Sequence, residues 1–171
     1  TTPLTLDAYV NGKNKKLFET NEIYNHAELE ARHEIMLEAY IKKVQIEARV
    51  MGDIATTFIL PSAIKYQNVL IKNITGLKNA GLSEKTYANQ KQVLEKISGH
   101  INIISDNVEN MIAERKKANE IIGTREMAIA YCDNVKGKYF DTIRYHVDKL
   151  ELLVDDSYWL LPKYRELLFL R

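Results

Sequence analysis

The chain has 171 residues, of which 46% are hydrophobic and 27% charged, and this balance excludes a disordered chain. Seven glycines and three prolines leave few turns, which argues against a many-stranded β fold. The net charge is +1, so no strong field draws the surface to nucleic acid or to anionic lipid. The single cysteine favours a reducing compartment, and no apolar run is long enough for a membrane span.

Residues 1–24 predict two short helical pieces separated by Asn11-Gly12, and we expect them to form a lead-in segment. The chain opens without Met, so we also expect it to be a piece of a larger protein. A long helix then starts at Asn25, which with Glu28 forms a capping-box pattern. Its apolar seam steps by three and four residues through Ile41, Val44, Ala48, Met51, Ala55 and Phe58. A second apolar face holds Ile46, Val50 and Ile54, which predicts packing from two sides.

Pro61 predicts a kink in this helix rather than its end, and the apolar stripe continues to Gly81. Ser83 should cap the next helix, over residues 84–122, and Thr124 the following one, which runs to about 155. The first carries a seam of the same spacing, and the second carries a stripe of inward-pointing residues. The inward positions are Leu94, Ile97, Ile101, Ile104, Val108 and Met111 in the first, and Ala128, Cys132, Val135, Tyr139, Ile143, Leu150 and Leu153 in the second.

Long helices of similar length joined by tight turns predict an all-α, up-down antiparallel bundle. We expect one domain over residues 1–171: the lead-in at 1–24, the bundle at 25–156 and a C-terminal tail at 157–171. The seams leave the order and handedness of the helices open. In the tail, nine of residues 158–170 are large and apolar or aromatic, so the tail must bury itself on its own bundle or on a neighbour. The candidate interface residues are Trp159, Tyr164, Leu167, Leu168 and Phe169.

Helical bundles often hold metals in their cores, and a di-iron site would need two Glu-x-x-His pairs and two further glutamates. Glu30 and His33 form one such pair. No second pair exists, because isoleucines stand three residues before His100 and His146. The hypothesis of a metalloenzyme therefore rests on one Glu-x-x-His pair, which a chance arrangement at the surface explains better.

The remaining chemistry-bearing residues have structural explanations. Cys132 lies on an apolar stripe and reads as a small core residue, while His100 and His146 read as hydrogen-bonded core or boundary histidines. Residues 115–117 form the one basic run, at a helix C-terminus where cations are favourable. No glycine-rich phosphate loop is present. The residues alone assign no catalytic, cofactor-binding or metal position.

Three stretches nevertheless resemble the C-terminal region of type III glutamine synthetases, and the match extends over essentially the whole chain, most loosely between residues 84 and 150. The opening Thr-Thr-Pro-Leu-Thr-Leu-Asp-Ala resembles the segment that follows the catalytic module of that family. The most distinctive stretch begins at Leu17-Phe18-Glu19 and includes residues 27–34, 37–40, 46–48, 53–55, 59–63 and Tyr66. The ending resembles the family's C-terminus at Tyr158-Trp159-Leu160-Leu161-Pro162, Tyr164 and Leu167-Leu168-Phe169.

The resemblance implies a cytoplasmic ligase that joins ammonia to glutamate with ATP and Mg²⁺ or Mn²⁺, assembled as a double-ring homo-oligomer. The catalytic modules would lie upstream, so no catalytic residue is carried over. This chain would brace the catalytic module and pack against neighbouring subunits, without nucleic-acid or membrane partners. The apolar seams of the helices, taken alone, also allow an alternative function: a self-contained helical bundle that binds a protein or a small ligand.

Overall fold

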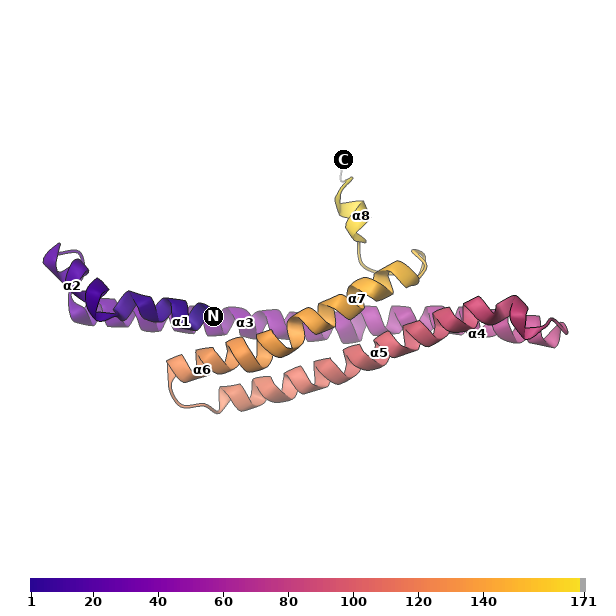
Figure 1. Cartoon of the computed structure of the whole chain (residues 1–171), viewed down its shortest axis with the longest axis horizontal. Helices are drawn as coiled ribbons and strands as arrows, with labels where there is room; N and C mark the ends of the chain where they lie inside the picture. Colours follow the sequence, from indigo (N-terminus) through magenta and orange to yellow (C-terminus); the bar gives the residue numbers. More distant parts are fainter. Residues whose placement is uncertain (170–171) are drawn as a thin grey trace. The chain divides into compact units, whose positions relative to one another are not determined.

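The computed structural model describes residues 1–169, and every regular element among them is a helix (Figure 1). The predicted all-α class is therefore confirmed. The chain divides into two compact units: Thr1–Val50 with Asn110–Asp141 is unit 1, and Met51–Glu109 with the residues from 142 onward is unit 2. Within the described residues, no helix is both long and apolar enough to cross a membrane.

Unit 1 begins with the two predicted short helices, α1 (Thr2–Asp7) and α2 (Gly12–Thr20), joined by a 3₁₀ turn, η1 (Ala8–Val10). Asn11 caps α2, because its side-chain oxygen accepts a hydrogen bond from the backbone N–H of Asn14 at 2.8 Å. Pro3 is buried in the first turn of α1, where its missing N–H costs nothing.

Helix α3 (His26–Ile54) starts at the predicted capping box. The backbone N–H of Asn25 donates to Oε2 of Glu28, and the backbone N–H of Glu28 donates to Oδ1 of Asn25, both at 2.9 Å. Each bond satisfies a donor that the first helical turn would leave unpaired. This local signal is why the sequence located the start of α3 to the residue.

The helix continues past Pro61 without a loop, as α4 (Leu60–Asn79), but a π-helical segment, η2 (Ala55–Ile59), intervenes. A π turn closes i→i+5 hydrogen bonds, so it inserts one residue into the helical count. The seam is shifted by that residue. Ile59 and Ala63 are buried at 4% and 0% exposure, whereas Phe58 is 40% exposed, so the predicted inward position of Phe58 is wrong.

The predicted second packed face of α3 is also wrong. Ile46 in unit 1 is 62% exposed and Val50 is 48% exposed, while Ile54 in unit 2 is half-buried. In each unit, the first seam faces the packed side and the second faces away from it. The two-sided apolar pattern therefore leaves bare apolar surface on the chain.

Helix α4 ends at Asn79, and the predicted stop signal Gly81 follows it with a φ of +78°, which suits a residue without Cβ. The N–H of Leu82 donates to the carbonyl of Leu77 at 3.2 Å, which satisfies one of the last free carbonyls. Helix α5 (Glu84–Asn119) follows directly after Ser83. Within unit 2, α4 and α5 are antiparallel, because the amide of Asn73 bonds to Gln90 and that of Gln67 bonds to Ser98.

The predicted α5 seam is confirmed at four of its six positions, while Leu94 and Ile101 are half-buried. Its unit 2 part buries Ile97, Ile104 and Val108, and its unit 1 part buries Met111 and Ala118, all at 3% exposure or less.

The fourth helical stretch comprises α6 (Thr124–Ala130), a second π-helical segment, η3 (Tyr131–Phe140), and α7 (Asp141–Leu153). Gly123, at φ +106°, stands at the N-cap of α6, and Thr124 is already helical; the prediction that Thr124 caps this helix is wrong. Its hydroxyl donates instead to Glu34 on α3 at 3.3 Å. The π register also buries Tyr131 and Phe140, which the regular seam did not include.

Unit 1 is held together by polar contacts between helices as well as by its core. The fully buried Tyr131 donates its hydroxyl to Oδ1 of Asn119 at 2.5 Å, and Gln45 on α3 donates to both, at 2.8 Å to Asn119 and 3.0 Å to Tyr131. Arg125 on α6 binds both carboxylate oxygens of Asp7, on α1, at 2.7–3.1 Å. These contacts fix how the lead-in and the three long stretches pack in this unit.

Candidate functional site

The base of the C-terminal tail is anchored on unit 2. Trp159 is buried at 8% exposure, and its backbone N–H donates to the carbonyls of Asp155 and Asp156 at 3.2 and 3.3 Å. The preceding Tyr158 stacks at an angle on Tyr66 of α4, with ring centroids 6.0 Å apart. Of the five candidate interface residues, Trp159 thus belongs to the anchor of the tail.

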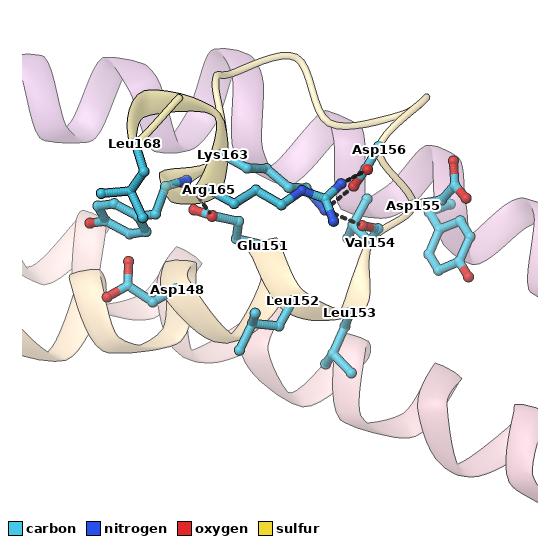
Figure 2. Close-up of a pocket in the computed structure, with 12 residues that line it drawn as sticks. Asp148, Glu151, Leu152, Leu153, Val154, Asp155, Asp156, Lys163, Arg165 and Leu168 are labelled. Carbon is cyan, nitrogen blue, oxygen red and sulfur yellow. Dashed lines mark hydrogen bonds and ion pairs between the residues drawn. The ribbon is translucent and has the colours of Figure 1, made fainter. Parts of the chain in front are cut away.

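Lys163 provides a second anchor for the tail. Only 8% exposed, it places Nζ 2.9 Å from the carbonyl oxygen of Val154 and 2.7 Å from Oδ1 of Asp156. A buried ammonium group needs such partners to offset the loss of water. Arg165 joins the same carboxylate, so two cations converge on Asp156 (Figure 2). This cluster was not predicted from the sequence, although a lysine within the apolar tail was a signal for it.

The turn between α7 and the tail is closed by Asp155. Its Oδ1 accepts hydrogen bonds from the backbone N–H of Ser157, at 2.9 Å, and from the Ser157 hydroxyl. Both bonds favour the ionised carboxyl and lower the pKa of Asp155. This Asx turn directs the chain back over the end of α7.

The outer tail carries the short helix α8 (Tyr164–Leu167), and its apolar side chains face solvent. Tyr164, Leu167, Leu168 and Phe169 are 47%, 50%, 79% and 79% exposed. Polar contacts nonetheless hold the backbone in place: the N–H of Tyr164 donates to Oε1 of Glu151 at 2.9 Å, and Arg144 donates to the Tyr164 hydroxyl at 3.0 Å. The outer tail is therefore an ordered, exposed apolar segment, which is typical of surfaces that bind another protein.

A groove of about 660 Å³ lies between the outer tail and the end of α7 (Figure 2). Leu152, Leu153 and Leu168 contribute apolar surface to it. Its acidic side chains outnumber its two basic ones, which are both engaged with Asp156: the lining includes Asp148, Glu151, Asp155, Asp156, Lys163 and Arg165. Together with the exposed tail this groove forms the candidate interaction surface of the chain.

The two residues that suggested a metal site are placed apart from any larger ligand cluster. Glu30 pairs with Lys15 at 2.9 Å and with His26 at 3.3 Å, and the Lys15 bond is the main reason that the pKa of Glu30 is lowered. His33 has Nε2 3.2 Å from Oδ1 of Asp7. Among residues 1–169, no three His, Cys, Asp or Glu side chains come together as metal ligands would.

Cys132 lies half-buried beside Tyr40 of α3 in unit 1. Burial, and then the contact with Cys132, raises the pKa of the Tyr40 phenol, so the phenol stays protonated near neutral pH. In unit 2, His100 and His146 are part-buried and bonded to each other, with 2.8 Å between their Nδ1 atoms. The expectation of hydrogen-bonded boundary histidines is confirmed, but their pairing was missed.

These features define a class of protein: an all-α helical domain that presents an ordered apolar tail. Residues 1–78 match the family described as "Glutamine synthetase C-terminal domain". A glutamine synthetase of Bacteroides fragilis (strain YCH46) is 40% identical over 98% of this chain, and a type-3 glutamine synthetase of Dictyostelium discoideum is 29% identical over 99% of it. The chain is therefore similar to the glutamine synthetase C-terminal domain over residues 1–78, and to these two relatives over almost its whole length. It spans 23% of the length of each of these two relatives.

Proposed function

We propose that this chain is the non-catalytic C-terminal domain of a type III glutamine synthetase and that its role is structural. The observation that carries the proposal is the extent of the alignment. It covers 98% of this chain at 40% identity but only 23% of the Bacteroides relative, and residues 1–78 match a family defined as C-terminal. The chemistry of the whole protein would then lie in the part outside this chain.

The whole protein would be an ATP-dependent glutamate–ammonia ligase, as the names of the relatives and the family resemblance suggest. Its nucleotide and its Mg²⁺ or Mn²⁺ would bind upstream. The described residues do not fit such a metal, since no three of their carboxylates, histidines or thiols converge. The assembly would be a large homo-oligomer, with the double ring that is implied by the family.

Within that assembly, the exposed outer tail would dock on the upstream catalytic module or on a neighbouring subunit. Four apolar side chains exposed by 47–79% on a backbone that is hydrogen-bonded into place are suited to this role. Ordering the tail beforehand lowers the entropy lost on binding. Trp159 would support docking by anchoring the tail on unit 2, without contacting the partner itself.

The first experiment is to measure the mass of the native polypeptide with an antibody raised to this chain. A band several-fold above 19.8 kDa supports the ligase proposal if the purified polypeptide of that mass also forms glutamine from glutamate, ammonia and ATP. A band near 19.8 kDa would overturn it and favour the self-contained binding bundle.

The docking role is tested in the full-length protein with Leu168→Ser/Phe169→Ser. Ile122→Ser is the matched control, since Ile122 is 97% exposed but belongs to unit 1 and not to the tail. We expect the tail variant to lose native mass in light scattering, while the control keeps it. A tail variant that assembles and resists heat as the unmodified protein does would overturn docking and leave the ligase proposal standing.

A further inference from the structure

The two paired histidines join helices α5 and α7 inside unit 2. Nδ1 of His100 lies 2.8 Å from Nδ1 of His146, and the ring centroids are 5.0 Å apart. A neutral imidazole carries one N–H, so one ring donates the hydrogen bond and the other accepts it. The bond can form while the pair is neutral or carries one extra proton. When both rings are charged, no acceptor remains and two cations face each other.

The surroundings of the pair do not offset a second positive charge. On α7, Lys149 lies one turn beyond His146, and its Nζ is 5.2 Å from the centre of the Tyr145 ring, whose edge meets the His146 ring. On α5, the exposed Lys96 precedes His100 by one turn. On α4, Gln67 donates an uncharged hydrogen bond to Ser98, which lies two residues before His100 on α5.

The charges that bear on His100 all have one sign. Burial first, and then His146 and Lys149, lower the pKa of the His100 imidazole below its ordinary value of 6.5. No carboxylate among the described residues acts on His100. The site therefore accepts a second proton only at the expense of the contact between α5 and α7.

We propose that His100 and His146 form a proton-sensitive latch between α5 and α7, closed while the pair holds at most one extra proton and released when both rings are charged. The latch is a property of the helical domain itself, independent of the ligase proposal. Because the folded pKa of His100 is lowered, its contribution to stability is fully present above the unfolded pKa of about 6.5. It is lost as the pH falls from there through the lower folded pKa.

Urea unfolding of the full 171-residue chain at pH 8 and pH 5 tests the latch. Trp159, the single tryptophan, lies in unit 2 with the pair and reports unfolding by its fluorescence. His100→Asn keeps a polar amide near the place of Nδ1 but takes up no proton. We expect the folding equilibrium constant of the unmodified chain to fall by a larger factor between pH 8 and pH 5 than that of His100→Asn.

His26→Asn is the matched control, because His26 is an exposed histidine of unit 1 and should leave the effect of the latch in place. An equal pH effect in His100→Asn and in the unmodified chain would overturn the proposal.

A second measurement does not depend on the His100 variant being folded. Imidazole resonances of the unmodified chain and of His146→Asn are followed against pH by NMR. We expect the titration midpoint of His100 to rise in His146→Asn, because one opposing charge is gone. A midpoint that does not move would show that the rings are not coupled and would overturn the latch.

Discussion

Truncating two neighbouring residues in the π-helical segment η2 gives a direct test of the helical register. Ile59 is 4% exposed and Phe58 is 40% exposed. Ile59→Ala removes three buried carbons, worth about 2.4 kcal/mol at about 0.8 kcal/mol each, and it leaves a cavity; we expect a loss of about 3 kcal/mol. Phe58→Ala removes a larger side chain that is partly in water and gains about 0.5 kcal/mol of helix propensity, so about 1 kcal/mol or less should be lost.

Both variants are compared with the unmodified chain by urea unfolding, followed by circular dichroism at 222 nm and by Trp159 fluorescence. An uninterrupted seam of steps three and four predicts the opposite order, since it places Phe58 inside and Ile59 outside. If Phe58→Ala costs more than Ile59→Ala, the π insertion is not part of the folded chain and the reasoning about register is refuted.

Four further variants test other features of the helices. Tyr131→Phe removes a buried hydroxyl from its hydrogen-bond network and should cost about 1–2 kcal/mol in urea unfolding; an unchanged stability would contradict the role of the network. Arg125→Gln should raise the pKa of Asp7, which the Arg125 hydrogen bond lowers, and so weaken a contribution that is present above about pH 4 and lost below it; NMR titration of the Asp7 carboxyl measures this, and no rise would refute it. Gly81→Ala should destabilise by about 1 kcal/mol because φ is +78°, whereas Gly99→Ala in the middle of α5 has open space and should stabilise by a similar amount; equal signs in thermal unfolding would contradict this.

Local chemistry explains why most of the helices could be predicted from the sequence. The capping box at Asn25 and Glu28 and the left-handed residue Gly81 are decided within a few residues of the chain. The start of α6 was predicted less well, because two adjacent residues could serve as its N-cap. Gly123 rather than Thr124 takes this position: a glycine tolerates φ of +106°, and the Thr124 hydroxyl donates instead to Glu34.

The π-helical segments could not be predicted by counting at 3.6 residues per turn. A π turn adds a residue to the helical count, so inward positions near it can differ from those of a regular seam. In η2 the buried residue is Ile59 rather than Phe58, and at the end of η3 Phe140 is buried although the regular seam did not include it, whereas Ile143 and Leu150 beyond η3 are buried as predicted. The proline after η2 was a usable signal of an irregular helix, because Pro61 has no N–H to donate to the carbonyl four residues earlier.

The candidate interface was predicted from the apolar composition of the tail, and the structure separates this tail into a buried anchor and an exposed segment. The apolar density of the tail indicated a segment that must be covered, and Trp159 is covered by its own unit while Phe169 is not. The anchor at Lys163 depends on a carbonyl nine residues away and on a carboxylate seven residues away, so no periodicity records it. A lysine at a position that is otherwise apolar is informative for this reason: its ammonium group must find partners wherever the chain folds.

The histidine pair shows how much more of a site can be recovered when two seams are compared. His100 lies three residues after the buried Ile97 and four before the buried Ile104, and His146 lies three after the buried Ile143 and four before the buried Leu150. Both rings thus occupy the same place relative to a buried layer of their helix. Helices that pack in a common core bring equivalent layers together, so matched polar residues at matched seam positions predict a contact. Read singly, each histidine is an ordinary boundary residue; read as a pair, they predict the hydrogen bond that joins α5 to α7.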